Sequence, residues 1–279
     1  MEFKERLKEY QDLVNKELDK YVKRYDCPEK IINDSVEYSL MAGGKRLRPI
    51  LVLDVYKLFK QDYEKAFPFA VALEMVHNFS LIHDDLPEID NDDFRHGKLT
   101  NHKKFNHATA LLAGDSLFNE AYIVISSDIQ KSIEKGDLKE MQNKGKAFVE
   151  FSIAVNRMIA GEYLDTELEG QNIEKELLQY IHENKTGALL KLAVRMGAIL
   201  AGAEEKDILK LLCSWQGNMP PSSIALLYIP RWILHQIMQF RLDLKRRNFY
   251  CGILHPKSKL SPTGECLLSR LRLISWRRL

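Results

Sequence analysis

The chain has 279 residues, with 41 Lys and Arg against 39 Asp and Glu, so its formal net charge is +2. With 45% hydrophobic and 29% charged residues, the composition is that of a globular protein, and the near-neutral charge argues against a general nucleic-acid-binding protein. The four cysteines show no CxxC spacing, so neither a zinc site nor a disulfide framework is expected; they are Cys27, Cys213, Cys251 and Cys266.

The charge is divided unevenly along the chain. Residues 1–213 hold 30 basic and 37 acidic residues, whereas residues 214–279 hold 11 basic and two acidic residues and all three Trp. The N-terminus is charged from its first residues and lacks the apolar core of a signal peptide. The longest apolar stretch, 224–240, is interrupted by Pro230 and Arg231 and is shorter than the ~20 residues of a membrane span. We therefore expect a cytoplasmic protein made of two unlike segments.

Apolar residues recur at helical spacing through the first segment, as in residues 7–18. Gly43 and Gly44 are typical of a helix end, and Pro49 suits the first turn of the next helix. Because strand-like alternation is scarce, the sequence predicts an all-α fold. The expected helices are 7–18, 29–41, 49–59, 67–85, 108–127, 139–169 and 174–200, with interruptions of the last two at Gly161 and Gly187.

The most informative segment carries a carboxylate cluster at the end of an apolar run. Asp84 and Asp85 follow the run, and a proline soon after them prevents regular continuation, so the chain can turn and bring Asp90 back towards Asp84. His77 lies two turns before Asp84, on the same helix face. Hard oxygen ligands of this kind suit Mg²⁺, with Mn²⁺ as a second candidate. The alternative is a solvated acidic turn.

Basic residues accompany this cluster in the sequence. Lys45, Arg46 and Arg48 lie at a predicted helix end, where the N–H groups of the following helix complete a candidate diphosphate seat. Segments 95–98 and 182–189 add further cations. Each cluster alone is also consistent with a solvated turn. Together they predict one site, in which acids hold a divalent cation, basic groups hold anions and apolar helices line a cavity for a hydrocarbon tail.

Five ordered motifs resemble those of the trans-isoprenyl diphosphate synthase family, and most closely those of its bacterial farnesyl diphosphate synthase type. They lie within about residues 30–213 and read GGKRLRP, EMVHNFSLIHDDLPEIDNDDFRHGKLTNHKKF, ATALLAGDSL, GEYLDTELEG and HENKTGALL. The resemblance implies an isoprenoid-synthase-type helical bundle around a central cavity. It also implies a homodimer that condenses an allylic diphosphate (dimethylallyl or geranyl diphosphate) head-to-tail with isopentenyl diphosphate, giving farnesyl diphosphate.

The same resemblance implies roles for individual residues. Asp84, Asp85 and Asp90 resemble the motif that holds Mg²⁺ on the allylic diphosphate, and Arg95 resembles a ligand of that diphosphate. His96 stands where the family has a second Arg. The residues that resemble the isopentenyl diphosphate site are Gly44, Lys45, Arg48 and His77. The pair that resembles the groups flanking the developing allylic cation is Lys185 and Thr186.

Two further features concern product length and completeness. Phe79, five residues before Asp84, resembles an aromatic floor that stops chain growth near fifteen carbons; the alternative is an ordinary core residue. The second aspartate-rich motif of the family, FQxxDDxxD, is missing from residues 214–279, where Asp243 is the only aspartate. We therefore expect impaired activity. The alternative is a catalytically inactive diphosphate-binding or regulatory protein.

The change in composition predicts a domain of residues 1–213 followed by a basic tail of residues 214–279. The resemblance implies that the C-terminal helices of the family fold are missing or replaced in this chain. Two interpretations of the tail stay open. One is an appendage that recruits a membrane surface or an acidic partner. The other is an out-of-frame readout of the 3′ end of the gene, which the abrupt loss of family motifs favours.

Overall fold

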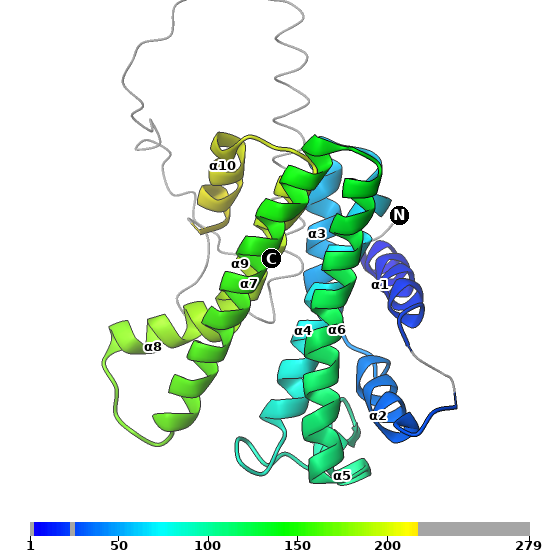
Figure 1. The fold of residues 1–279 in the computed structure, drawn as a ribbon. Coiled ribbons are helices and arrows are strands. Elements are labelled where there is room, and N and C mark those ends of the chain that lie inside the picture. The colour runs from blue at the N-terminus through cyan, green and yellow to red at the C-terminus, as the bar shows by residue number, and fades with distance from the viewer. Residues whose placement is uncertain (1–2, 23–25, 217–279) are drawn as a thin grey trace, which may run out of the picture. The chain divides into compact units, whose positions relative to one another are not determined.

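The computed structural model describes residues 3–22 and 26–216, all of them within the unit Met1–Arg241 (Figure 1). Predictions about residues 217–279 therefore lie outside the described residues. The described helices and strands are α1 (Phe3–Asp19), α2 (Lys30–Leu40), α3 (Leu47–Phe59), the 3₁₀ turn η1 (Tyr63–Ala66), α4 (Phe67–Asp84), β1 (Phe94–Arg95), β2 (Lys98–Leu99), α5 (Asn101–Lys104), α6 (His107–Glu134), α7 (Leu138–Glu167), α8 (Lys175–His182), the π-helical turn η2 (Glu183–Gly187), α9 (Ala188–Leu200) and α10 (Glu205–Gln216).

The helices form a bundle in which α6 packs on α4, α4 on α3, α3 on α9, α9 on α7 and α7 on α6, so that these helices close a ring. Helices α1 and α2 lie on the outside of this ring, against α3, α4 and α6 (Figure 1). The C-terminal ends of α4 and α7 reach the same end of the bundle, at the bottom of Figure 1. The carboxylate cluster follows the end of α4 and the motif GEYLDTELEG lies at the end of α7. The packing of the ring therefore brings these two motifs together.

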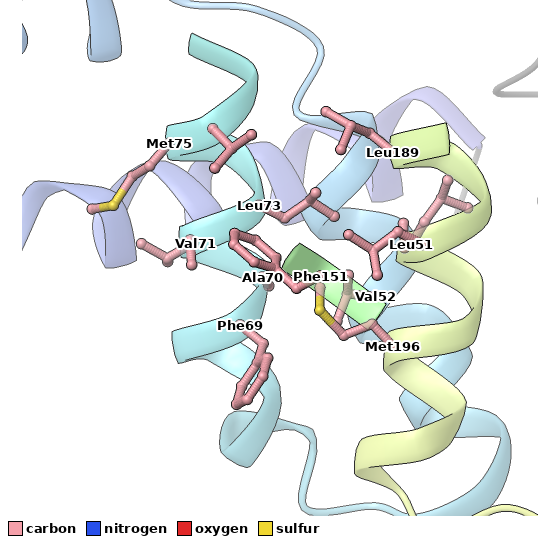
Figure 2. Close-up of a cluster of buried hydrophobic side chains, with 14 of the residues drawn as sticks. Leu51, Val52, Phe69, Ala70, Val71, Leu73, Met75, Phe151, Leu189 and Met196 are labelled. Carbon is pink, nitrogen blue, oxygen red and sulfur yellow. The ribbon is translucent and has the colours of Figure 1, made fainter. Parts of the chain in front are cut away.

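Apolar side chains fill the middle of the ring. Helix α4 is buried around most of its circumference, which fits its long apolar sequence. Leu73 of α4, Val52 of α3, Phe151 of α7 and Met196 of α9 gather in the core shown in Figure 2. Side chains from four helices thus interlock, and the core fixes how the helix ends are arranged.

The all-α prediction is confirmed, and the predicted helices lie close to their observed bounds. The expected interruption at Gly187 is also confirmed, because the π-helical turn η2 separates α8 from α9 there. The expected interruption at Gly161 is wrong, because α7 runs through it unbroken. This glycine is buried against another backbone segment, so it serves close packing rather than a helix break. The hairpin β1–β2 and helix α10 were not predicted.

The helix ends follow the local sequence. Asn106 and Asp137 cap α6 and α7 through side-chain oxygens that accept from backbone N–H groups three residues on. Gly43 and Gly44, with φ of +109° and +124°, end the segment after α2 in conformations that glycine adopts without strain. No described helix is long and apolar enough to cross a membrane.

Helices α3 and α9 approach so closely at Gly197 that a Cβ there would lie 2.4 Å from the carbonyl oxygen of Val52. We expect Gly197→Ala to lower the free energy of unfolding by about 1–3 kcal/mol, because the helices must separate. Gly145→Ala is the matched control, since a Cβ at this glycine of α7 meets nothing within 4 Å. It should raise stability by ~0.5–1 kcal/mol. Urea unfolding measures both, and equal effects would contradict the close approach.

Candidate active site

The first carboxylate cluster lies where α4 ends. Asp84 is the last helical residue and Asp85 the cap, and the backbone then turns so that the N–H of Asp90 donates to the carbonyl oxygen of Asp84 at 2.9 Å. The prediction that the chain folds Asp90 back towards Asp84 is confirmed. Asp84 and Asp90 therefore face the same region, while Asp85 is almost fully buried.

A two-residue hairpin brings a cation to this cluster. Strands β1 and β2 pair antiparallel, and the loop between them is His96-Gly97, with φ of +53° and +76°. Positive φ at both positions is typical of a type I′ turn, which matches the twist of a hairpin. The Nε of Arg95 donates to Asp85 Oδ1 at 2.7 Å, and Nη2 lies 2.5 Å from the same oxygen. His96 lies exposed at the hairpin tip.

The loop that carries these residues is tied to the bundle by polar side chains. Thr100 Oγ1 donates to the carbonyl oxygen of Asp92 at 2.7 Å. Asn101 is buried and bonds to α2, donating to the Ser35 carbonyl oxygen at 2.9 Å and to Ser39 Oγ at 2.8 Å. Because buried amides need such partners, the segment after the hairpin has one fixed position. The end of the second motif, TNHKKF, thus has a structural role.

The basic segment before α3 divides into core and surface residues. Arg46 is 3% exposed and has left-handed backbone, and its guanidinium donates to Asn15, Glu74 and the Leu40 carbonyl oxygen at 2.6–2.9 Å. The prediction that Arg46 belongs to the diphosphate seat is therefore not supported by its contacts: it fastens α1, α2 and α4 together. Lys45 is exposed beside it.

Arg48 and His77 lie in a shared, largely buried region. The Nε of Arg48 is buried and has no hydrogen-bond partner in the described part of the chain. Burial, with repulsion from Arg48 and Arg46, lowers the pKa of His77 well below its usual value, and Arg95 and His96 contribute further. The positive charges around His77 therefore act on the same small region. An unpaired buried donor beside them suits an anionic ligand.

Two residues of the site were not predicted individually. On α7, Glu162 Oε1 and Asp165 Oδ2 accept from Lys185 Nζ at 2.9 and 2.5 Å. Although burial lowers it, hydrogen bonds to Asp165 and Glu162 raise the pKa of Lys185 above its ordinary value. The motif GEYLDTELEG contains both acids, but nothing in one helical sequence indicates that they face η2. Thr186 lies in η2 next to Lys185.

An aromatic series runs inward from the carboxylate cluster. The ring of Phe79 lies 4.9 Å from that of His83 and 4.9 Å from that of Phe118, and Phe118 lies 5.1 Å from Tyr122. Tyr122 in turn contacts Phe151 of α7 at 5.5 Å. Phe79 is 9% exposed. It is thus buried near the acid cluster and stands first in a stack shared by α4, α6 and α7.

A pocket of about 300 Å³ opens beside the cluster. Asp90 lines one side of it, and residues of the α7 end and the following loop line the other, among them Asp165, Thr166 and Ile173. Burial first, and then repulsion from Glu162, raises the pKa of Asp84 to about 7, while Lys185 opposes this shift. Asp84 of α4 and Glu162 of α7 are therefore close enough to repel one another.

These donors fit Mg²⁺ in chemistry. Asp84 and Asp90 supply hard oxygen atoms, and the pKa of Asp84 is raised by burial first and then by repulsion from Glu162. Within the described residues, no three His, Cys, Asp or Glu side chains converge closely enough to hold a metal ion by themselves. Mg²⁺ is commonly bound by one or two carboxylates with substrate phosphates completing its shell, so this arrangement remains compatible with it. Asp85 is engaged by Arg95 instead.

Comparison with known proteins places this geometry in a family. Residues 29–217 match the family model described as Polyprenyl synthetase, which is more than half of the chain. The chain therefore belongs to the polyprenyl synthetase family, and the resemblance of its motifs is confirmed. It is 40% identical over 195 residues to the farnesyl diphosphate synthase of Bacillus subtilis (strain 168), which covers 70% of this chain and 64% of that protein. The chain thus spans slightly less than two thirds of that relative.

Solved structures agree with the fold. The apo structure of an FPP/GFPP synthase from Zymomonas mobilis has a TM-score of 0.69 and 30% identity, covering 76% of this chain and 75% of that one. A geranyltransferase from Helicobacter pylori, complexed with magnesium and isoprenyl diphosphate, has a TM-score of 0.64 and 27% identity, covering 72% and 66%. The predicted isoprenoid-synthase-type fold is confirmed by these similarities.

The raised pKa of Asp84 makes stability depend on pH. A carboxyl group with a higher pKa folded than unfolded binds more protons in the folded state, so stability falls as the pH rises from about 4 to about 7. In metal-free protein, Asp84→Asn should therefore raise the free energy of unfolding by ~2–4 kcal/mol at about pH 8 and by much less at about pH 4.

Asp93→Asn is the control for this titration, because Asp93 is exposed and pairs with Lys103 at 2.8 Å. Its effect should be small, because solvent screens an exposed ion pair. Urea unfolding across this pH range measures both variants. A stabilisation by Asp84→Asn that does not grow with pH would contradict the assignment.

Proposed function

We propose that the chain is a Mg²⁺-dependent prenyltransferase that condenses an allylic diphosphate with isopentenyl diphosphate to give farnesyl diphosphate. The single observation that carries this is the meeting of three motifs at one end of the bundle. On α4, Asp84 lies near Lys185 of η2 and His77 lies near Arg48 of α3, and the charge of Arg95 acts on both Asp84 and His77. The names of the similar proteins, among them farnesyl diphosphate synthase, support the substrate class.

The two ends of the site suit two different anions. Arg95 is oriented by Asp85 through Nε and Nη2, so its Nη1 is available for the allylic diphosphate. Gly44, Lys45, Arg48 and His77 are proposed to receive the diphosphate of isopentenyl diphosphate, and the unpartnered Nε of Arg48 supports this. His77 is uncharged in this field and would act as a hydrogen-bond donor or acceptor rather than a cation.

Bound Mg²⁺, or Mn²⁺, would neutralise the leaving diphosphate, and Asp84 and Asp90 are the residues proposed to hold it, with Asp85 behind them. The C–O bond of the allylic substrate breaks with its electron pair on the diphosphate. The double bond of isopentenyl diphosphate then forms the new C–C bond, and a proton leaves to the released diphosphate. Lys185 and Thr186 are proposed to flank the positive charge that develops at the allylic carbon.

An apolar wall is needed beside that charge, because water would capture the allylic cation. The aromatic series that begins at Phe79 supplies such a wall. Its position supports a role for Phe79 as the floor that limits the hydrocarbon chain near fifteen carbons. The homodimer that the resemblance implies stays a prediction, which sedimentation equilibrium tests.

The second candidate is a diphosphate-binding protein without turnover. The observation that favours it is the lack of an FQxxDDxxD segment in residues 214–279, which contain one aspartate. The frame-shift interpretation of this tail is tested separately by translating the gene in all three forward frames beyond codon 213. An FQxxDDxxD segment in another frame would support it.

We expect the chain with Mg²⁺, geranyl diphosphate and labelled isopentenyl diphosphate to form a C15 product, at a rate lowered by the missing motif. Lys185→Ala should reduce that rate further, by about 10²-fold, because it removes a preorganised cation. Product extraction against a boiled control measures this. Without any product above the control, catalysis by this chain would be excluded. Binding of both diphosphates by calorimetry would then support the second candidate.

Phe79→Ala should shift the products beyond C15, because it opens the first ring of the aromatic series. The control is Phe69→Ala, which removes a buried ring ten residues earlier on the same helix, in the core of Figure 2. Both variants should lose ~3–5 kcal/mol of stability. Only Phe79→Ala should change the product length, as measured by chromatography of the dephosphorylated alcohols. An unchanged product would make Phe79 an ordinary core residue.

A further inference from the structure

Helix α7 and the turn η2 are in direct backbone contact at Gly161. A Cβ on this residue would lie 2.2 Å from the backbone nitrogen of Lys185 and 2.8 Å from its Cα. Real Cβ atoms do not approach other atoms so closely, and the obstacle is backbone rather than a flexible side chain. Only glycine therefore lets η2 rest on α7 at this position.

The next turn of the same helix holds the side chain of Lys185. Glu162 and Asp165 are three residues apart, so they lie on one face of α7, and both contact Lys185 Nζ. Their side chains are 17% and 44% exposed, and that of Lys185 is 28% exposed. Glu162 is thus the more buried partner, where an ion pair loses less to solvent screening.

The turn that carries Lys185 departs from regular α-helix. Residues 183–187 form a π-helical turn, in which the regular i→i−4 hydrogen bonds of the flanking helices are replaced by wider ones. Such turns occur often at functional sites. A long lysine side chain on this turn has many rotamers, so its position must be set by contacts from another element. Helix α7 is the element that supplies them.

We propose that Gly161, Glu162 and Asp165 are positioning residues for Lys185. Gly161 seats the backbone of η2, and the two carboxylates hold the ammonium group between α7 and the end of α4. The inference rests on the proposed function in one respect, which is that Lys185 acts at the reaction centre. The positioning itself is a property of the chain without substrate.

Labelling of amines in the substrate-free protein tests this directly. Reductive methylation at about pH 8, read out peptide by peptide by mass spectrometry, reports how freely each lysine reacts as an uncharged, accessible amine. Glu162→Gln should speed the labelling of Lys185 about tenfold, the change that corresponds to one pKa unit. Asp165→Asn should speed it less, because Asp165 is more exposed, and the double variant should exceed both.

Glu150→Gln is the matched control. Glu150 also lies on α7 and holds a cation of α9, Arg195, through two short hydrogen bonds. It is twelve residues from Glu162, or about 18 Å along the helix. This control should leave Lys185 labelling unchanged. If the double variant also leaves it within twofold of the wild type, the proposed positioning is wrong.

Gly161→Ala tests the backbone seat, because it keeps both carboxylates but pushes η2 away. It should speed Lys185 labelling in protein that circular dichroism shows to be folded; unchanged labelling there would exclude a role for Gly161. Should it fail to fold, the carboxylate variants still decide the rest.

In the C15 assay, Glu162→Gln should lower kcat by more than it raises KM. Altered labelling without any turnover would uphold the positioning and refute the proposed function.

Discussion

The burial of the carboxylate end of α4 is the constraint on which the rest of this site depends. An apolar helix that ends in Asp84 and Asp85 takes these groups out of water, and a desolvated carboxylate must be neutralised or paired. Asp85 is paired by Arg95. Asp84 has no such direct partner among the described residues, and burial, followed by repulsion from Glu162, raises its pKa to about 7. The surrounding elements can be understood as ways of bringing cations to this point.

Each of these elements uses a local backbone device. The hairpin needs two residues with positive φ to turn Arg95 back onto Asp85, and His96-Gly97 provides them. The turn η2 needs a wide helical turn and a glycine on α7 to approach the site. Both devices cost conformational free energy, which the packing of the ring of helices offsets. The unusual backbone conformations thus lie next to Arg95 and at Lys185, the residues proposed to bind or stabilise charge.

The sequence predicted what depends on periodicity and missed what depends on tertiary contact. Helices such as α4 and α6 follow from apolar spacing, and the return of Asp90 to Asp84 follows from a proline. Gly161 was misjudged because a glycine in a helical pattern is consistent with a break or with close packing, and only the partner backbone distinguishes them. Arg46 was predicted to belong to the diphosphate seat with Lys45 and Arg48. The sequence alone does not reveal that its guanidinium pairs with Glu74 in the core.

The final arrangement of charge is asymmetric, and that asymmetry bears on how two diphosphates would be told apart. On the α4–α7 side, the five acids Asp84, Asp85, Asp90, Glu162 and Asp165 outnumber the two cations Lys185 and Arg95. A diphosphate proposed to bind there would therefore gain from an added divalent cation. On the α3 side, the Nε of Arg48 has no hydrogen-bond partner in the described part of the chain, so a diphosphate proposed to bind there would need no metal. If both proposed seats serve one reaction, a metal-dependent and a metal-independent diphosphate seat would give each substrate its own place, and hence fix which of them loses its diphosphate.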